Sequence, residues 1–494
     1  MNICDFLAAN ASAMPDHPAI VDGERELTYA ELNDRVLRIA GHLRALGVDR
    51  GDRVAVALKD HAEHVAVIFA IARVGATVLS LEWRSSPAQR EATAGRFRAK
   101  MTIVEGPGLG SSSKEVIALD EEWNARVAAA PPDRSSGDYW SVPLVIALTG
   151  GTTGAAKGVL LTNGQMFMRY LSNLHRGLIS KGSRYLSALP LCFTAGRAFC
   201  IYHVISGNTV IFYSSPLFDA VGFASIARNQ TVTATILVPT QLRMLLAAAG
   251  DNGPMLPDME RLVCSSAPLT AEEKRSVVRQ LTPNLYECYA SSEGGNMTVL
   301  DPGDMANPES VGRATFGIQL EIVDEEDRPL PVGATGRIRC RGPGVASGVI
   351  GSADGEGSEG FRDGWHYPGE FAAFDERGYL YLKGRASDMI IRNGINIYPQ
   401  EIEDVLVAHP AVAEAAVVGR ASEGEGEVPV AFVVAAGDPD PVALRRHCAK
   451  RLSHYTVPER FIFVDALPLT AAQKVHKDDL RARLKEEEPG AGER

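Results

Sequence analysis

Three threonines, four glycines and a lysine lie within ten residues of one another, and together these groups could hold phosphate. Glycine lets a backbone wrap closely around a ligand, and consecutive main-chain N–H groups then form a nest for an anion. Threonine hydroxyls add hydrogen-bond donors, and the lysine adds a mobile positive charge. The segment is not of the Walker type, because its lysine precedes a glycine instead of following one before Ser or Thr. The phosphate-binding residues that we expect are Thr149, Gly150, Gly151, Thr152, Thr153, Gly154 and Lys157.

Other polar segments could contribute to the same chemistry. Residues 289–293 close a predicted strand and end in the carboxylate of Glu293. Residues 365–370 also end in a carboxylate, and a lysine stands near the C-terminus at position 474. Taken alone, each segment has an ordinary structural interpretation, such as a strand end with one surface glutamate or a solvated lysine.

Several such segments occur in the order and spacing that are typical of one enzyme superfamily. The chain resembles the adenylate-forming superfamily, and within it the acyl-CoA synthetase (ligase) branch. Two N-terminal segments, residues 27–32 and 47–54, also fit, so the resemblance covers essentially the whole chain. The segments that carry it are residues 149–158, 289–293, 365–370, 384–390, 394–403 and 467–475.

The resemblance implies an enzyme that activates a carboxylic acid with ATP and Mg²⁺ and passes the acyl group to coenzyme A. Such chemistry needs phosphate clamps, a magnesium ligand, a ribose anchor and a cation near the reacting oxygens. By resemblance, Tyr289 stacks on adenine, Ser292 meets phosphate and Glu293 holds magnesium. Glu370 is the candidate for the ribose anchor, and Arg385 is expected near ribose and phosphate.

The resemblance also implies a C-terminal lid that turns about a hinge. Asp388 occupies the hinge position, and Gly394 lies where the backbone lines the tunnel for pantetheine. Lys474 takes the position of the lysine that assists adenylation. One lid orientation would bring Lys474 to the α-phosphate, and the other would present the Gly394 region to coenzyme A. The catalytic residues that we expect are therefore Lys474, Glu293 and Arg385.

The acyl pocket is expected beside these segments, and its composition predicts a hydrophobic acid. Two consecutive glycines after Glu293 would leave room for the acyl group. Phe193, Phe199, Tyr202 and Met297 could surround an apolar group, although such residues more often belong to a core. The pocket residues that we expect are Phe193, Gly196, Ser266, Ala267, Ala290, Gly294 and Gly295.

Four departures from the superfamily pattern stand out, and three of them concern ATP handling. Gly150 and Ala156 replace a serine and a proline in the phosphate loop, which removes a hydroxyl donor and a rigid turn. Glu370 replaces an aspartate, and Gln473 replaces a glycine next to the expected catalytic lysine. Phe193 replaces a common histidine near the acyl pocket.

These departures leave several functions open. We favour an acyl-CoA ligase that performs the complete reaction. In the alternative, the adenylation step is weak or lost, and the enzyme only thioesterifies a preformed acyl-adenylate that a separate adenylating enzyme supplies. A stand-alone adenylation enzyme that loads a carrier protein is a further alternative. A non-catalytic adenylate-binding protein fits less well, because the lid lysine and the magnesium glutamate would have no purpose.

The composition excludes several other classes of protein. The 494 residues are 45% hydrophobic and 22% charged, as in ordinary globular proteins. A formal net charge of −11 without a Lys/Arg run argues against nucleic-acid binding. Seven scattered cysteines without a Cys-x-x-Cys pair suit free thiols in the cytoplasm. No segment reads as a signal peptide or a membrane span, and a homodimer is left open.

The order of apolar and polar segments predicts an α/β fold with two domains. Strands alternate with helices over residues 140–290, which indicates a largely parallel sheet with ligands beyond its carboxyl edge. Residues 311–383 alternate as hairpins, which predicts a small β-barrel-like part. We expect an N-terminal domain over residues 1–386 that binds the adenylate and the acyl group. A small mobile α+β lid would follow over residues 387–494, with its hinge near Asp388.

Overall fold

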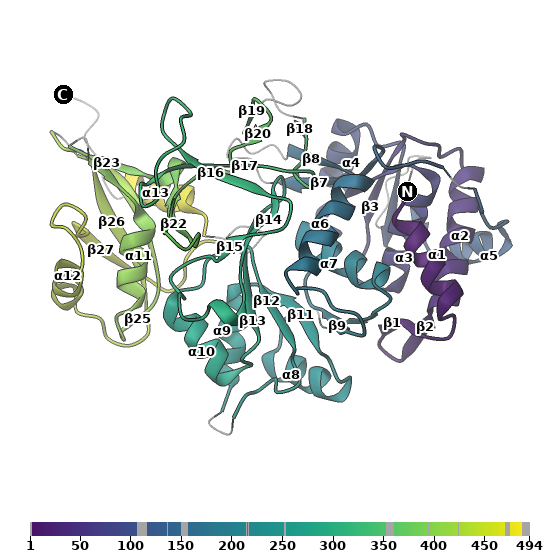
Figure 1. The fold of residues 1–494 in the computed structure, drawn as a ribbon, viewed down its shortest axis with the longest axis horizontal. Coiled ribbons are helices and arrows are strands. Elements are labelled where there is room, and N and C mark those ends of the chain that lie inside the picture. Colours follow the sequence, from purple (N-terminus) through teal and green to yellow (C-terminus); the bar gives the residue numbers. More distant parts are fainter. Residues whose placement is uncertain are drawn as a thin grey trace.

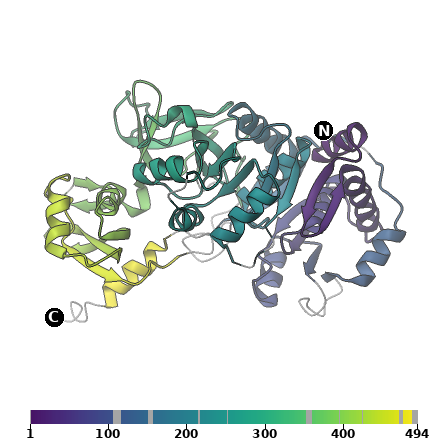
Figure 2. The ribbon, with the colours of Figure 1, turned by 90° about the horizontal axis from the view of Figure 1, so that it is seen from below.

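The computed structural model describes residues 2–105, 116–135, 137–149, 157–213, 215, 217–250, 253–351, 360–393, 395–422, 424–469 and 475–486. These residues form four sheets. Two large, mostly parallel sheets are built from strands between residues 18 and 350, and a smaller antiparallel sheet is built from strands between residues 319 and 385. The last sheet lies at one end of the molecule, opposite helices α1–α5, in two perpendicular views (Figures 1 and 2).

The first large sheet contains β7 (Pro143–Thr149) and β8 (Lys157–Thr162), the two strands on either side of the predicted phosphate-binding segment. Its strand order is β18-β8-β7-β4-β3-β5-β6, and β3, β4, β5, β6 and β7 run parallel. The apolar run over residues 143–148, before the predicted phosphate-binding segment, predicts a buried strand, and β7 confirms it. The strands are β3 (Arg53–Ala57), β4 (Thr77–Ser80), β5 (Met101–Glu105), β6 (Val116–Leu119), β7 (Pro143–Thr149), β8 (Lys157–Thr162) and β18 (Val349–Ile350).

The second large sheet has nine strands in the order β15-β14-β13-β12-β11-β9-β10-β1-β2. Its middle strands are parallel, and β2, β14 and β15 are antiparallel to their neighbours. The strands are β1 (Pro18–Asp22), β2 (Arg25–Thr28), β9 (Arg184–Ser187), β10 (Thr209–Phe212), β11 (Ala234–Leu237), β12 (Arg261–Cys264), β13 (Leu285–Ser291), β14 (Gly295–Leu300) and β15 (Arg313–Ala314). Apolar runs at residues 209–213, 234–238, 261–264 and 284–289 predict buried strands, and β10, β11, β12 and β13 confirm this prediction.

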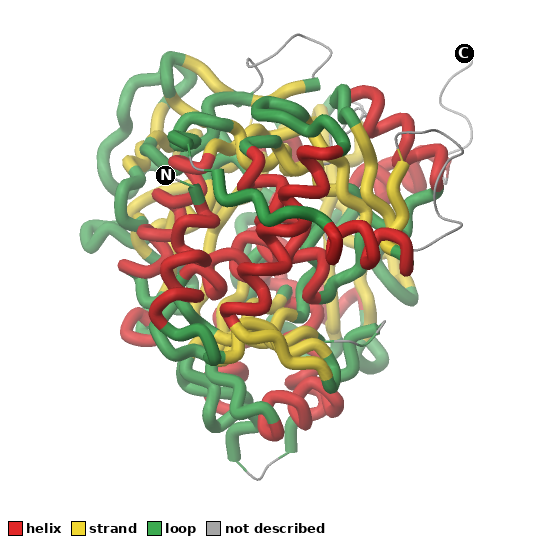
Figure 3. The backbone as a smooth tube through the Cα atoms, turned by 90° about the vertical axis from the view of Figure 1, so that its right-hand side faces the viewer, coloured by secondary structure: helices red, strands yellow, loops and turns green. Residues whose placement is uncertain are grey.

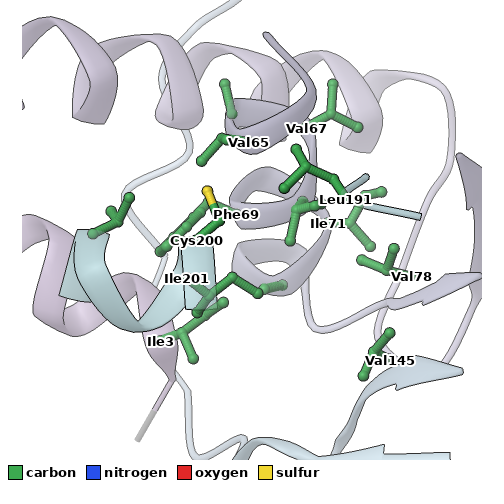
Figure 4. Packing of buried hydrophobic residues seen from close by; sticks show 14 of the residues in the cluster. Ile3, Val65, Val67, Phe69, Ile71, Val78, Val145, Leu191, Cys200 and Ile201 are labelled. Carbon is green, nitrogen blue, oxygen red and sulfur yellow. The ribbon is translucent and has the colours of Figure 1, made fainter. Parts of the chain in front are cut away.

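Helices fill the space between the two large sheets and cover their outer faces. Nearly every residue of α3 (Ala62–Val74) is buried, because it packs between α1 (Ile3–Ala13), α7 (Thr194–Ile205) and strands of the first sheet. Figure 4 shows this packing, and Figure 3 shows helices in the middle of the molecule with strands around them. The other helices of this part are α2 (Tyr29–Ala45), α4 (Pro87–Arg96), α5 (Glu121–Ala129), α6 (Asn163–His175), α8 (Ala220–Asn229), α9 (Pro239–Ala248) and α10 (Ala271–Gln280).

In the sequence, Thr162 with Gln165 and Thr270 with Glu273 are capping boxes that predict the starts of two helices, and the structure confirms both. The Thr162 hydroxyl accepts a hydrogen bond from the Gln165 amide at the start of α6, and Thr270 caps α10 with Glu273 in the same way. The apolar stretch over residues 66–81 is α3 followed by β4, and is therefore a buried core segment. Among the described residues, none of the helices combines the length and the apolar composition that crossing a membrane requires.

Residues 319–385 form an antiparallel sheet, and the predicted hairpins are present. Strands β19, β20, β17, β21 and β22 are neighbours in that order, and β16 pairs with β17. The strands are β16 (Gln319–Val323), β17 (Gly336–Arg341), β19 (Phe361–Arg362), β20 (Trp365–His366), β21 (Glu370–Phe374) and β22 (Leu380–Arg385). A short 3₁₀ helix, η1 (Pro302–Asp304), precedes them.

The C-terminal unit is α+β, as predicted, and has a hydrophobic core of its own around Ile402 and Val433. Its sheet has the order β24-β23-β26-β25, with β27 parallel to β26. The elements are η2 (Ala386–Asp388), β23 (Ile390–Arg392), β24 (Ile395–Ile397), α11 (Pro399–Val407), β25 (Val412–Ser422), β26 (Gly426–Ala435), α12 (Pro441–Ala449), β27 (Arg460–Val464) and α13 (Lys477–Glu486).

A buried ion pair ties α10 to the strand that leads into the site. Lys274 Nζ lies 2.6 Å from Glu287 Oε2, and the two side chains are only 2% and 3% exposed. Lys274 also donates to the carbonyls of Pro308 and Ser310, and Glu287 accepts from the Leu269 amide. Burial raises the pKa of Glu287, and the positive charge of Lys274 opposes this rise. Removing one partner would therefore leave an uncompensated buried charge.

We predict that Lys274→Met lowers the free energy of unfolding by about 3–5 kcal/mol at pH 8. The cost should shrink toward pH 5, because a Glu287 pKa raised in the folded state lets the carboxyl bind a proton there as pH falls. Urea unfolding followed by circular dichroism measures both effects.

The matched control is Arg275→Met on the same helix, whose side chain is 50% exposed beside Glu309. We expect this change to cost less than about 1 kcal/mol. Equal losses of unfolding free energy in the two variants, or a loss in Lys274→Met that does not depend on pH, would contradict the role of the Lys274–Glu287 pair.

Candidate active site

Glu293 stands at the tip of the hairpin formed by β13 and β14. Ser291 pairs with Gly295 across the hairpin, which leaves a three-residue loop. Gly295 closes the loop with a φ of +71°, a conformation that favours glycine. Residues 289–293 therefore end a strand, as predicted, and the carboxylate is carried just beyond the ladder.

Contacts from other segments hold this tip. The Glu293 carbonyl accepts a hydrogen bond of 2.8 Å from the Ala346 amide. The Gly294 amide donates to Ser291 Oγ over 2.8 Å, and Ser292 Oγ lies 3.1 Å from Thr194 Oγ1 at the start of α7. The predicted phosphate ligand Ser292 is thus brought to the loop that carries the predicted pocket residue Phe193.

The predicted nucleotide residues Tyr289, Glu370 and Arg385 form one cluster. The Tyr289 hydroxyl donates to Glu370 Oε2 over 2.9 Å, and Arg385 Nε lies 3.3 Å from Glu370 Oε1. Glu370 and Arg385 face each other across β21 and β22. Burial, and then the Glu370 carboxylate, raise the pKa of Tyr289, so the phenol stays protonated. Glu370 is 13% exposed and Arg385 is 56% exposed, which leaves the guanidinium accessible to a ligand.

The phosphate-binding segment joins β7 and β8 at the carboxyl end of β7. Thr149 pairs with Lys157 across this hairpin, so the ladder holds both ends of the segment together. Ligands of parallel sheets bind at this edge. The predicted ligands Gly150, Gly151, Thr152, Thr153 and Gly154 lie outside the described residues.

The predicted lid residues are described only in part. Asp388 Oδ1 accepts a hydrogen bond of 2.7 Å from Arg481 of α13, which ties the predicted hinge to the last described helix. Gly394 and Lys474 lie outside the described residues. Val475, the residue after Lys474 in the sequence, bridges to Leu469.

The predicted pocket residues come from three segments, and several are in tight contact with protein atoms. Gly196 faces the backbone of Leu189 and Pro190, where a Cβ atom would lie 2.4 Å from the Pro190 oxygen. Ser266 has a φ of +86°, which strains a non-glycine residue, and Ala267 follows it. Phe193 precedes α7 and is half-buried.

The rest of the predicted pocket lies on the Glu293 hairpin. Ala290 sits at a bulge and pairs with Asn296. A Cβ atom on Gly294 would lie 3.0 Å from Met297 Sδ, and one on Gly295 would lie 3.0 Å from Arg169 Nε. The two glycines therefore let the hairpin tip approach Met297 and Arg169 closely. Whether they also leave room for an acyl group stays a prediction.

His366 is a neighbour of the tip that sequence reasoning did not single out. The ring is 4% exposed, its Nδ1 lies 3.0 Å from the Gly360 carbonyl, and its Nε2 lies 3.5 Å from Ser291 Oγ. Burial lowers the pKa of His366, so the ring is neutral at neutral pH and keeps one acceptor nitrogen. His366 lies within the segment 365–370, and this segment comes near the Glu293 hairpin only because β20 pairs with β17. That pairing joins residues far apart in the sequence.

The described residues fit a magnesium ion that is shared with phosphate. Among them, no group of three or more acidic, His or Cys side chains could form a complete metal site. Magnesium commonly takes only one or two carboxylates and completes its shell with phosphate oxygens and water. The Glu293 carboxylate at an otherwise uncharged tip meets that requirement.

Comparison with known proteins gives matches over both parts of the chain. The sequence profile of the AMP-binding enzyme family matches residues 7–350, and that of the AMP-binding enzyme C-terminal domain matches residues 401–474. Indoleacetate–CoA ligase of Aromatoleum aromaticum is 33% identical, with 97% of this chain and 98% of that protein aligned. A 2-succinylbenzoate–CoA ligase of Bacillus mycoides is 29% identical over 98% of this chain and 99% of that protein.

Solved structures resemble the fold over nearly its whole length. The o-succinylbenzoate CoA synthetase of Bacillus subtilis, in complex with its acyl-adenylate intermediate, has a TM-score of 0.84 and 26% identity, covering 96% of this chain and 97% of that one. ATP-bound MatB of Rhodopseudomonas palustris has a TM-score of 0.87 and 27% identity, covering 98% and 99%.

We predict that Glu370→Gln weakens the binding of AMP by about ten- to one-hundred-fold, because a neutral amide forms weaker hydrogen bonds to the ribose hydroxyls and no longer pairs with Arg385. Isothermal titration calorimetry of the purified variant measures the change. Glu376→Gln, an exposed glutamate in the turn between the same two strands, is the control. An unchanged affinity for AMP in Glu370→Gln would remove Glu370 from the nucleotide site.

Proposed function

The chain belongs to the AMP-binding enzyme family, and from this premise we propose that it is an acid–thiol ligase that joins a hydrophobic carboxylic acid to coenzyme A through an acyl-adenylate. The observation that carries the proposal is that one hairpin, formed by β13 and β14, holds both a nucleotide-site residue and the candidate metal ligand. This hairpin bears Tyr289 of the nucleotide cluster on one strand and Glu293 at its tip. The 33% identity to an indoleacetate–CoA ligase over 97% of this chain supports an aromatic or similarly apolar acid.

In the first half-reaction, a carboxylate oxygen of the acid attacks the α-phosphorus of ATP. The bond from that phosphorus to the oxygen bridging to the β-phosphate breaks, and pyrophosphate leaves. Magnesium would screen the phosphate charges, with Glu293 as its protein ligand. Glu370 and Tyr289 would orient the nucleoside, and Arg385 and Lys474 would stabilise the charge that develops on the α-phosphate.

In the second half-reaction, the thiolate of coenzyme A attacks the acyl carbonyl, and AMP leaves with the electron pair of the carbon–oxygen bond. We propose that residues 387–494 act as a lid that turns about Asp388 between the two steps. Gly394 would then line the path of the pantetheine arm. The Arg481–Asp388 ion pair supports this assignment, because it couples the hinge to α13.

We also propose the compartment of the enzyme, the kind of acid that it uses and its partners. All seven cysteines are buried and unpaired, which supports a reducing compartment such as the cytoplasm. The acyl pocket around Phe193 and Ala290 favours an apolar acid. A homodimer, a carrier protein in place of coenzyme A, and a separate enzyme that supplies the acyl-adenylate are the alternatives for its partners.

We predict acyl-CoA from the wild-type enzyme with coenzyme A and either of two inputs. One input is ATP, Mg²⁺ and an acid from a panel of indole-3-acetate, phenylacetate, benzoate and 2-succinylbenzoate. The other is the matching synthetic acyl-adenylate. Mass spectrometry detects the thioester product.

Product from both inputs supports the complete ligase. Product from the adenylate alone would overturn the adenylation step and support the alternative in which Gly150, Ala156 and Gln473 disable ATP use. No thioester from either input, with acyl transfer to a carrier protein instead, would overturn the ligase assignment.

We predict that Lys474→Ala slows the formation of acyl-adenylate by about 10²–10³-fold, because it removes the charge that stabilises the transition state at the α-phosphate. The rate of thioester formation from synthetic acyl-adenylate should change by less than about threefold, since the turned lid would have withdrawn Lys474 from the phosphate in that step. Quenched single-turnover assays separate the two steps. The control is Lys477→Ala, three residues after Lys474, which breaks the ion pair between Lys477 and Glu403. Equal slowing of both steps in Lys474→Ala would contradict the role of that lysine.

A further inference from the structure

Arg169 of α6 is a buried cation next to the hairpin that carries Glu293. Its side chain is 6% exposed. Nη2 donates to the Glu293 carbonyl over 2.5 Å, and Nε donates to the Gly344 carbonyl over 2.7 Å. Among the described residues, no carboxylate forms an ion pair with this guanidinium. Its hydrogen bonds therefore go to two backbone segments that are far apart in the sequence.

The hairpin tip is shaped to receive this arginine. Gly295 has a φ of +71°, and a Cβ atom there would lie 3.0 Å from Arg169 Nε. A Cβ atom on Gly344 would lie 3.1 Å from Arg169 Cγ. The two glycines thus allow both backbones to lie directly against the side chain, and Ala346 adds its own amide to the Glu293 carbonyl. Arg169 and Ala346 fix the main chain at the residue that bears the carboxylate.

Burying a guanidinium costs more folding free energy than burying an apolar side chain of similar size. Burial lowers the pKa of Arg169, and the Tyr202 hydroxyl and the Glu293 carboxylate oppose that effect. A buried charge without a paired carboxylate usually destabilises a fold relative to an apolar side chain of similar size. Packing alone would be served as well by methionine, so the two carbonyl contacts are the feature that distinguishes arginine here.

We propose that Arg169 is a positioning residue for the ATP half-reaction, because it fixes the main chain of Glu293 so that the carboxylate faces the magnesium–phosphate group. The inference rests on the proposed function, in which Glu293 is the magnesium ligand. Thioester formation uses neither magnesium nor pyrophosphate, so the effect of Arg169 is confined to steps that involve Mg²⁺–ATP.

The chain offers a matched control on the same helix. Arg176 lies seven residues after Arg169 and is mostly buried, with a side chain 16% exposed. Its Nη2 donates to the Val299 carbonyl over 2.9 Å, on the same hairpin strand β14 but away from the tip. A variant at Arg176 therefore removes an arginine–carbonyl contact to the same strand, together with an ion pair of 3.4 Å to Asp301, without touching Glu293.

The test compares Arg169→Met, Arg169→Lys and Arg176→Met with the wild type by isothermal titration calorimetry. The probes are Mn²⁺–ATP, which reports on the metal and phosphates, and AMP, which reports on the nucleoside site alone. We expect Arg169→Met to weaken Mn²⁺–ATP binding by about ten- to one-hundred-fold, as for the loss of a hydrogen bond from a charged donor. AMP affinity should change by less than about twofold. Arg169→Lys should restore part of the loss, and Arg176→Met should leave the ratio of the two affinities unchanged.

A second measurement uses indole-3-acetate and its synthetic adenylate. ATP–pyrophosphate exchange should fall in Arg169→Met and need more Mg²⁺ for half-maximal rate, whereas thioester formation from the adenylate should stay within about threefold of the wild type. Equal losses of Mn²⁺–ATP and AMP binding, or no loss of either, would overturn the role of Arg169. If Arg169→Met does not fold, the ratio of affinities in Arg169→Lys decides in the same way.

The proposed function can fail separately from this inference. A wild-type enzyme that binds Mn²⁺–ATP but makes no thioester would overturn the ligase function and leave the calorimetric ratio to judge Arg169. A wild type that binds AMP but not Mn²⁺–ATP would overturn the role of Arg169 directly.

Discussion

A residue at the tip of a hairpin cannot have its main chain held by the hairpin's own strands, because the hydrogen-bond ladder between the strands ends before it. The Glu293 main chain must therefore find its hydrogen bonds elsewhere. Arg169 of α6 and Ala346 both donate to its carbonyl. The neighbouring side chains Ser291 and Ser292 reach His366 and Thr194. The geometry at Glu293, the metal ligand that we propose, thus depends on four segments outside the hairpin, and the rest of the architecture brings those segments together.

Helix α6 has a central place in this arrangement. It begins directly after β8, the second strand of the phosphate-binding hairpin, with Thr162 as its cap. Seven residues after that cap, Arg169 reaches the tip of the β13–β14 hairpin in the other large sheet. One rigid helix therefore connects the segment that would hold the phosphates with the carboxylate that would hold the metal. Residues of α3 and α7 belong to one buried hydrophobic cluster with strands of both large sheets.

Local patterns in the sequence were sufficient for much of this account. Alternation of apolar residues and capping boxes located the strands around Tyr289 and the start of α6. Motif spacing selected Tyr289, Glu370 and Arg385, which the structure brings into one hydrogen-bonded cluster. These features are predictable because each is encoded within a few residues. The roles of Gly394 and Lys474, which lie outside the described residues, stay predictions.

Features that depend on contacts between distant segments were not predictable from one sequence. Arg169 stands in an otherwise apolar run of α6, residues 166–171, and nothing in that run shows what its guanidinium contacts. Only the fold places it under Gly295. The Lys274–Glu287 pair has no local signature either, since its partners come from α10 and β13. The strained Ser266 could not be found by composition, because only the backbone angle reveals it.

The central claim is that the carboxylate of Glu293, whose main-chain carbonyl is held by Arg169 and Ala346, is the protein ligand of the metal that accompanies ATP. A crystal structure of the wild-type enzyme with ATP and Mn²⁺, with the metal located by anomalous scattering, tests it most directly. The account predicts an anomalous peak between a Glu293 carboxylate oxygen and the phosphates, with Arg169 bonded to the Glu293 carbonyl. A metal bound away from Glu293, or a tip that leaves Arg169 when ATP binds, would contradict it.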